Sequence, residues 1–158
     1  MRRLYNDAPD ATYGLVASSH AKVLRRHGVD NGYMATSRMN IARWFNAPRG
    51  DPSSCTALDQ PVTEFGCQGL ELDLPVVCWG EDLRWKAGHW ELTPIRRRYR
   101  QVDPAQLLRN AYRVLLTRGR DGLVAFLPEV SMLDETEHIL LAAGLRPLPS
   151  VIDLAAEG

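Results

Sequence analysis

Two short segments of this 158-residue sequence carry polar residues where they could contact a ligand. The first, residues 62–73, places Gly69 between Gln68 and Glu71 after a predicted strand, and a backbone without a side chain can approach a ligand closely. The second, residues 110–124, places Arg118 at the end of a predicted helix, just before an apolar strand. An arginine at such an edge can be aimed rigidly across an interface, and its planar guanidinium suits phosphate. Both segments are therefore candidates for binding an anionic group.

The elements around these segments alternate between strands and helices, which predicts an α/β layered domain with a mainly parallel sheet. Between the first two strands, Pro48 ends a helix and the stretch 47–54 is a loop. Ser18 or Ser19 caps the first helix, and Gly28 ends it. The expected strands are 14–18, 61–65, 74–79 and 123–127, with a hairpin over 83–92; the expected helices are 19–27, 37–46 from Ser37, 103–117 and 134–143, the last ended by Gly144.

The helix over 103–117 has the strongest sequence signal. Asp103 is a capping residue, and Pro104 follows at the first helical position. Arg109 and Arg113 fall outside the apolar stripe of this helix. That stripe consists of Leu107, Leu108, Ala111, Val114 and Leu115.

Formal charge cancels over the chain, with 19 Lys and Arg against 19 Asp and Glu, but it is distributed unevenly. Residues 1–83 carry 8 basic and 10 acidic groups, residues 84–120 carry 10 and 2, and residues 121–158 carry 1 and 7. Nine of the ten central cations are arginine, and their potentials add. A solvated polar face explains any single arginine, whereas the whole cluster favours an anionic partner such as a nucleotide or nucleic acid.

Composition predicts a globular, cytoplasmic protein with free thiols. The hydrophobic fraction of 45% can build a core, and no window approaches the roughly 18 apolar residues that span a bilayer. Cys55, Cys67 and Cys78 cannot all pair, and neither they nor the four histidines show the spacing of a metal or catalytic site. We therefore expect no metal site and no membrane partner.

At the two polar segments the chain resembles the fifth and sixth motifs of superfamily 1 helicases, and in particular the Schlafen-like helicase-type ATPases. In that group the usual sequence of the fifth motif is Gln-Gly-Leu-Glu-Phe-Asp, and that of the sixth is Asn-Thr-Tyr-Arg-Val-Leu-Leu-Thr-Arg-Gly. Residues 68–73 match with Leu72 replacing the aromatic residue, and residues 110–119 match with Ala111 replacing threonine. The resemblance covers roughly residues 12–128 and implies a three-layer RecA-like domain, the second of a P-loop motor. Residues 1–147 would form it, with 83–100 as a hairpin and basic insertion and 148–158 as a loosely held tail.

The resemblance implies a role for each matching residue. Arg118 matches the arginine finger that reaches the γ-phosphate of a nucleotide in the cleft between two motor domains. Gln68, Gly69 and Glu71 match positions near the nucleotide, and Thr63 matches a position that contacts the nucleic-acid backbone. The arginines of the basic insertion are expected to contact nucleic acid as well: Arg96, Arg97, Arg98 and Arg100. Relatives often carry histidine in place of Phe65 and a polar residue in place of Gly66, so these two departures weigh against nucleic-acid contact by this loop.

Each of these roles has a plainer alternative. Arg118 could cap its helix, where a cation gains about 0.3–1 kcal/mol from the helix dipole. Gln68 and Glu71 could be ordinary exposed loop residues. Trp79, Trp85 and Trp90 could form a base-stacking platform, but packing in the core or the hairpin is the favoured interpretation.

The sequence lacks the residues with which a P-loop motor binds nucleotide tightly. It contains no Gly-Lys dipeptide of a Walker A loop, and no Asp-Glu pair ends an apolar strand to hold Mg²⁺. We therefore expect a chain that is inactive alone and binds ATP with Mg²⁺ only beside an N-terminal Walker A-containing domain. The alternative is a non-enzymatic module, derived from such a domain, that binds DNA, RNA or a protein. An independent small enzyme has no supporting motif.

Overall fold

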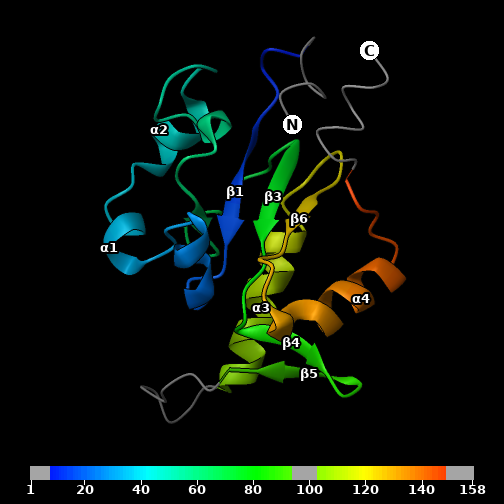
Figure 1. Ribbon diagram of the computed structural model, residues 1–158. Helices are drawn as coiled ribbons and strands as arrows, with labels where there is room; N and C mark the ends of the chain where they lie inside the picture. The colour runs from blue at the N-terminus through cyan, green and yellow to red at the C-terminus, as the bar shows by residue number, and fades with distance from the viewer. Residues whose placement is uncertain (1–7, 94–102, 149–158) are drawn as a thin grey trace.

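The computed structural model describes residues 8–93 and 103–148 of the chain. Its centre is a sheet of four parallel strands in the order β2-β1-β3-β6 (Figure 1). The α/β class with a mainly parallel sheet is therefore confirmed. The strands are β1 (Tyr13–Ala17), β2 (Val62–Thr63), β3 (Leu74–Cys78) and β6 (Val124–Phe126).

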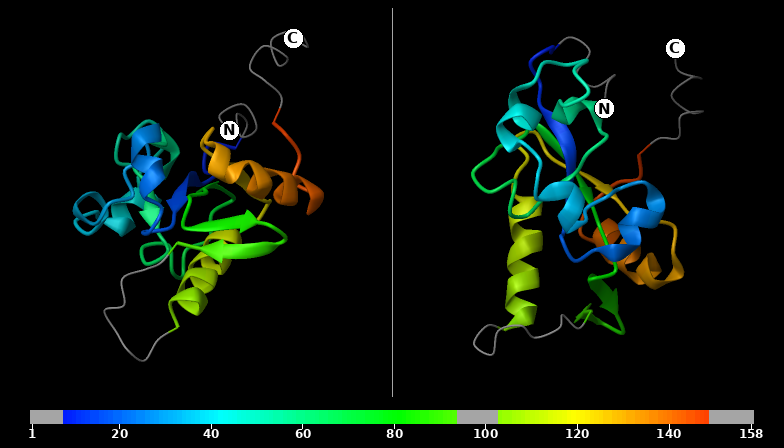
Figure 2. Two further views of the ribbon diagram at one scale, coloured as in Figure 1. Left: turned by 60° about the horizontal axis from the view of Figure 1, so that its bottom comes forward. Right: turned by 90° about the vertical axis from the view of Figure 1, so that its left-hand side faces the viewer.

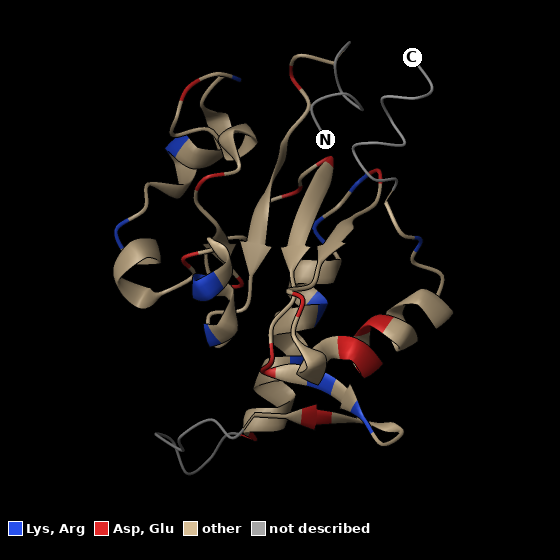
Figure 3. Cartoon of the chain, in the orientation of Figure 1, with Lys and Arg blue, Asp and Glu red and all other residues tan. Residues whose placement is uncertain are grey.

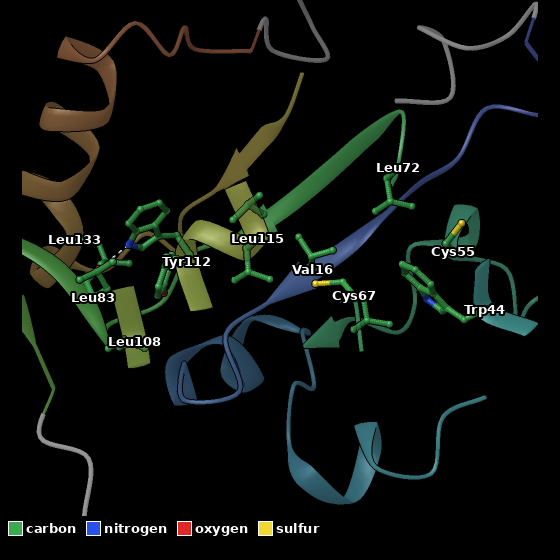
Figure 4. Packing of buried hydrophobic residues seen from close by; sticks show 13 residues of the cluster. Val16, Trp44, Cys55, Cys67, Leu72, Leu83, Leu108, Tyr112, Leu115 and Leu133 are labelled. Carbon is green, nitrogen blue, oxygen red and sulfur yellow. Dashed lines mark hydrogen bonds between the residues drawn. The ribbon is translucent and has the colours of Figure 1, made fainter. Parts of the chain in front are cut away.

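Helices cover both faces of this sheet. Helix α3 (Pro104–Leu116) lies on one side, while the 3₁₀ helix η1 (Lys22–His27) and helix α4 (Asp134–Ala142) lie on the other (Figure 2). Neighbouring residues of one strand consequently face different clusters: Val16 packs in the larger cluster and Ala17 in the smaller one. The larger cluster joins the sheet to α3 (Figure 4) and includes Val16, Val77, Leu108, Tyr112 and Leu115.

Helix α3 agrees with its prediction at both ends but not along its whole stripe. The Asp103 carboxylate accepts a hydrogen bond from the Ala105 N–H at 2.9 Å, and Pro104 opens the helix. Leu107, predicted to be buried, is 52% exposed, so the stripe was wrong at that position. Tyr112 is buried in its place, because its hydroxyl finds a hydrogen-bond partner inside the protein.

The first predicted helix is shorter than expected and is capped differently. It is the 3₁₀ helix η1, and neither serine caps it; the Glu81 carboxylate accepts the Val23 N–H at 3.0 Å instead. The Ser18 hydroxyl instead donates to the carboxylate of Asp82. Gly28 ends the helix as predicted, in the left-handed conformation with φ of 82°.

The region between β1 and β2 also differs from its prediction. The helix expected over 37–46 is present only as α2 (Ile41–Asn46). The short helix α1 (Tyr33–Thr36) precedes the expected range, and a 3₁₀ turn η2 (Cys55–Ala57) follows α2. Asn40, not Ser37, caps α2, because its side chain accepts the Arg43 N–H. The strand expected over 61–65 stops at Thr63. The chain turns there, and the Thr63 carbonyl accepts a hydrogen bond from the Gly66 N–H at 2.9 Å.

The predicted hairpin is present and is fastened to α4. Strands β4 (Leu83–Lys86) and β5 (His89–Leu92) meet at a two-residue turn, Ala87-Gly88, where both φ values are positive as this tight turn requires. The Trp85 N–H donates to Thr136 Oγ1 and the Ala87 N–H to Glu135 Oε2, each at 2.9 Å, and a 3₁₀ turn η3 (Ser131–Leu133) precedes α4.

The tryptophans of this region pack against one another. Trp79 is 2% exposed and stacks on Trp90 at 5.8 Å, and Trp85 meets Trp90 edge-on at 5.3 Å. The packing interpretation is therefore confirmed for the buried Trp79, whereas Trp85 and Trp90 are only half-buried and keep accessible surface. Of the other predictions, the arginines of the basic insertion (Arg96, Arg97, Arg98, Arg100) and residues 149–158 of the tail lie outside the described residues.

Candidate functional site

The two polar segments singled out in the sequence lie side by side at the edge of the sheet where the strands begin. The Leu72 N–H donates to the Arg118 carbonyl at 2.8 Å, and the Arg120 N–H donates to the Leu72 carbonyl at 2.9 Å. Leu72 and Gly119 form a parallel bridge, and the Asp121 N–H donates to the Asp73 carbonyl at 3.0 Å. This edge, which we call the motif junction, consists of residues 69–73 and 117–121.

At the motif junction the Arg118 side chain is half-buried and bonded within its own chain. Its Nε donates to the Val114 carbonyl at 3.0 Å, its Nη1 to the Leu70 carbonyl at 3.2 Å, and its Nη2 to Thr117 Oγ1 at 3.4 Å. The bond to Val114 is the helix cap that the sequence left as an alternative. The bond to Leu70 ties the guanidinium to the loop that carries the other candidates.

The remaining candidates of this edge are exposed. Gly69 has φ of 78° and open space where a side chain would begin, so a ligand can approach its backbone. Gln68 is exposed and lies one residue away. Glu71 pairs with Arg120 at 3.2 Å, and Arg120 also reaches Asp73 at 3.7 Å. The structure therefore brings Gln68, Gly69, Glu71 and Arg118 together.

Gly119 fixes the backbone beside Arg118, and this leads to a prediction. A Cβ atom at residue 119 would lie 1.8 Å from the Gly122 carbonyl oxygen and 2.9 Å from Pro75 Cδ. We expect Gly119→Ala to lower the free energy of unfolding by about 1–3 kcal/mol, because the backbone must shift to admit the methyl group. Urea denaturation measures this loss. Gly66→Ala, where the nearest atom is the flexible end of Ile41 at 3.0 Å, serves as the milder control; equal losses in the two variants would contradict the prediction.

Thr63 lies at the opposite edge of the sheet. It is in register with Ala17, and Ala17 is in register with Cys78, six residues beyond Leu72. At about 3.3 Å per residue this separates Thr63 from the motif junction by about 20 Å along the strands. Thr63 is only 6% exposed, whereas Phe65 is 69% exposed. The residues expected near nucleotide and the one expected near nucleic acid therefore lie at different edges.

That second edge holds a buried polar network which sequence reasoning missed. The Asp82 carboxylate accepts from the Ser18 hydroxyl and, at 2.7 Å, from the Tyr112 hydroxyl, and all three residues are at most 2% exposed. Glu64, also buried, accepts the N–H and the hydroxyl of Ser19 at 2.8 and 2.7 Å. Part of the signal was present, since Ser18, Glu64 and Asp82 lie at or just beyond the carboxyl ends of predicted strands, and the carboxyl ends of parallel strands share one edge.

The cysteines are buried and show no sign of activation. All three are free, and burial raises the pKa of Cys67 to about 11 and that of Cys78 to about 12. A thiol with a raised pKa stays protonated and is a poor nucleophile. Cys67, next to Gln68, therefore fills space in the core.

The arginines of residues 84–120 are partly neutralised by acids. Arg84 pairs with Glu91 at 2.6 Å, and Arg109 approaches Asp103 at 3.8 Å. The pairs of Arg84 and Arg120 reduce the charge available to a partner, whereas the longer contact leaves Arg109 about half exposed. The acids of the later segment gather on α4 (Figure 3). Within residues 8–93 and 103–148, no group of three or more His, Cys, Asp and Glu could hold a metal ion.

The comparisons identify one family. The family model described as Schlafen group 3, DNA/RNA helicase domain, matches residues 3–129, which include both edges of the sheet but not α4. No curated protein and no solved structure matches the chain. Among the described helices, none has the length and apolar character needed to cross a membrane.

Proposed function

Because this chain belongs to the family of Schlafen group 3 DNA/RNA helicase domains, we propose that it is the second, C-terminal RecA-like domain of a nucleic-acid-associated ATPase. In this proposal the motif junction forms one wall of an ATP cleft. The other wall is a Walker A-containing domain, in the same chain or in another. The family match and the mainly parallel sheet support the proposal at the level of the domain.

The observation that carries the proposal is the backbone pairing between residues 72–73 and 118–121. Two segments almost fifty residues apart in sequence are locked in register, and Arg118 and the exposed backbone of Gly69 lie on the same edge. A guanidinium has five N–H donors, and Arg118 uses three of its nitrogens in bonds to its own chain. The remaining donors are free to meet a phosphate.

The residues present fit a nucleotide phosphate but not a metal ion. Arg118 offers a cation in a partly buried setting, where it would stabilise charge developing on the γ-phosphate during transfer. Glu71 is held by Arg120, which limits its repulsion of the phosphates. Since the described residues offer no metal cluster, we assign Mg²⁺ to the Walker A-containing domain.

Complementation tests this function. We expect the purified chain to show no ATP hydrolysis above background, and hydrolysis to appear when it is mixed with, or fused to, the first RecA-like domain of a Schlafen group 3 helicase. Phosphate release measures both. The first domain alone is the control, and the proposal is refuted if its rate is unchanged by adding a folded preparation of this chain.

A further inference from the structure

A groove with a volume of about 390 Å³ lies between α3 and the β4–β5 hairpin. Thr117 of the motif junction borders it, but Arg118 and the other candidate residues do not line it. One wall is the flank of α3 with Tyr112 and Leu116, and the other is formed by Trp79 and Trp90. These elements lie together at the lower end of the molecule in Figure 1. Ligand pockets in proteins are about 300–1,000 Å³ and mainly apolar, so this groove is large enough for one small planar group.

The buried part of both walls is aromatic and rigid. Trp79 and Tyr112 are each 2% exposed, their ring centroids lie 4.5 Å apart, and Trp79 is fixed by a hydrogen bond from its Nε1 to the Leu83 carbonyl. Trp90 is half-buried and Leu116 is 36% exposed, so these two present the accessible apolar surface. A planar ring can stack on such a surface whatever its hydrogen-bonding edge.

Two arginine side chains line the groove on its α3 side. Arg109 and Arg113 are four residues apart on the helix and so project on the same side. The only carboxylate near Arg109 among the described residues is Asp103, at 3.8 Å with both side chains about half exposed, so this pair is weak. No carboxylate in the described part of the chain pairs with Arg113. Both guanidinium groups are therefore available to an anion.

From this combination we infer that the groove binds a nucleobase, with the phosphate attached to it held by Arg109 and Arg113. A strand of single-stranded nucleic acid and a free nucleotide share this chemistry. The inference deepens the proposed function, on which it rests for the relevance of nucleic acid, because it names a place where a strand is held. It involves neither Arg118 nor ATP, so the two proposals can fail separately.

Tryptophan fluorescence of the full chain tests the inference, without ATP and without a partner domain. Titration with a 12-residue oligo(dT) is compared with dTMP and with inorganic phosphate. We expect the oligonucleotide to quench the fluorescence, and Arg109→Gln with Arg113→Gln to weaken binding by about tenfold or more while reducing the salt slope by about two. Dependence of dTMP binding on the same residues, at equal affinity, identifies a free nucleotide as the ligand.

Two further variants separate stacking from charge. Leu116→Ala removes apolar surface from the groove but keeps both arginines, so we expect weaker binding with an unchanged salt slope. Arg26→Gln with Arg146→Gln removes two exposed cations elsewhere and should leave affinity within about twofold, apart from general screening. Equal binding by the wild type, the Arg109 and Arg113 double variant and Leu116→Ala would overturn the inference, as would binding of phosphate as tightly as the oligonucleotide.

Discussion

Replacing Arg118 with alanine should reduce the complemented ATPase rate by about a thousandfold or more, the usual contribution of an arginine finger. Because the interaction would form mainly in the transition state, we expect kcat to fall while the KM for ATP changes little. The measurement is steady-state phosphate release by the mixture or fusion of the two domains. Arg118→Lys should recover only part of the rate, because an ammonium group cannot replace the planar fork of the guanidinium.

The bonds of Arg118 within its own chain require a second measurement. Alanine removes the donors to Val114 and Leu70, so the variant will lose some stability as well as activity. Thermal unfolding must therefore show that the variant is folded at the assay temperature. Arg146→Ala is the matched control, since it removes an exposed arginine far along the chain. Full activity in a folded Arg118→Ala protein would show that Arg118 serves only as a helix cap and would contradict its role as an arginine finger.

The largest effect on stability is expected at Asp82. Its carboxylate is the acceptor for both the Ser18 and Tyr112 hydroxyls, which are completely or almost completely buried. In Asp82→Ala both donors lose their partner, and each unsatisfied buried group costs about 1–3 kcal/mol. We expect the free energy of unfolding to fall by about 2–4 kcal/mol, because removing a buried carboxyl offsets part of the cost. Urea denaturation measures the change.

Two variants show whether the lost hydrogen bonds cause this effect. Tyr112→Phe deletes one donor and keeps the ring, so it should cost about 1–2 kcal/mol. Asp59→Ala removes an exposed aspartate of a loop and should change stability by less than about 0.5 kcal/mol. A loss in Asp82→Ala no greater than in the Asp59 variant would show that the network contributes nothing.

The same carboxyl makes stability depend on pH. Burial raises the pKa of Asp82, and the hydrogen bonds from Ser18 and Tyr112 offset this only in part. A raised pKa means that the folded state binds the proton more tightly than the unfolded state. Asp82 therefore contributes stability below the ordinary carboxyl pKa, and this contribution is lost as pH rises to the raised value. We expect the stability difference between the wild type and Asp82→Asn to shrink over that range and to be constant above it.

The elements that were predicted well carry their signals locally. Asp103 and Pro104 set the start of α3, Gly28 ends η1, and the apolar run before Trp79 is a buried strand. The errors arose where distant residues decide the structure. Glu81 caps η1 although it lies 58 residues away from Val23, and Ser18 bonds Asp82 instead of capping the helix. No residue near η1 in the sequence indicates this distant cap.

The sequence predicted which segments meet at the motif junction but not how their side chains bond there. The resemblance of residues 68–73 and 110–119 selected them, and their pairing at one edge follows from the parallel sheet. The inward bonds of Arg118 and the pairing of Arg120 with Glu71 depend on side-chain positions that only the folded chain defines. The network at the other edge was missed because the sequence pattern makes Ser18 and Ser19 candidate helix caps and places Glu64 inside a strand, while their observed partners lie far away in the sequence.

The hairpin contacts set the limits of the smallest fragment that can be produced for experiments. Cutting after residue 129 would keep every residue of the family match, yet it would remove the Thr136 and Glu135 acceptors of the hairpin backbone and the buried Leu133. A fragment designed on the family boundary would expose the apolar side of the hairpin and the sheet, which favours aggregation. The unit of folding thus extends through α4, past the unit of sequence similarity.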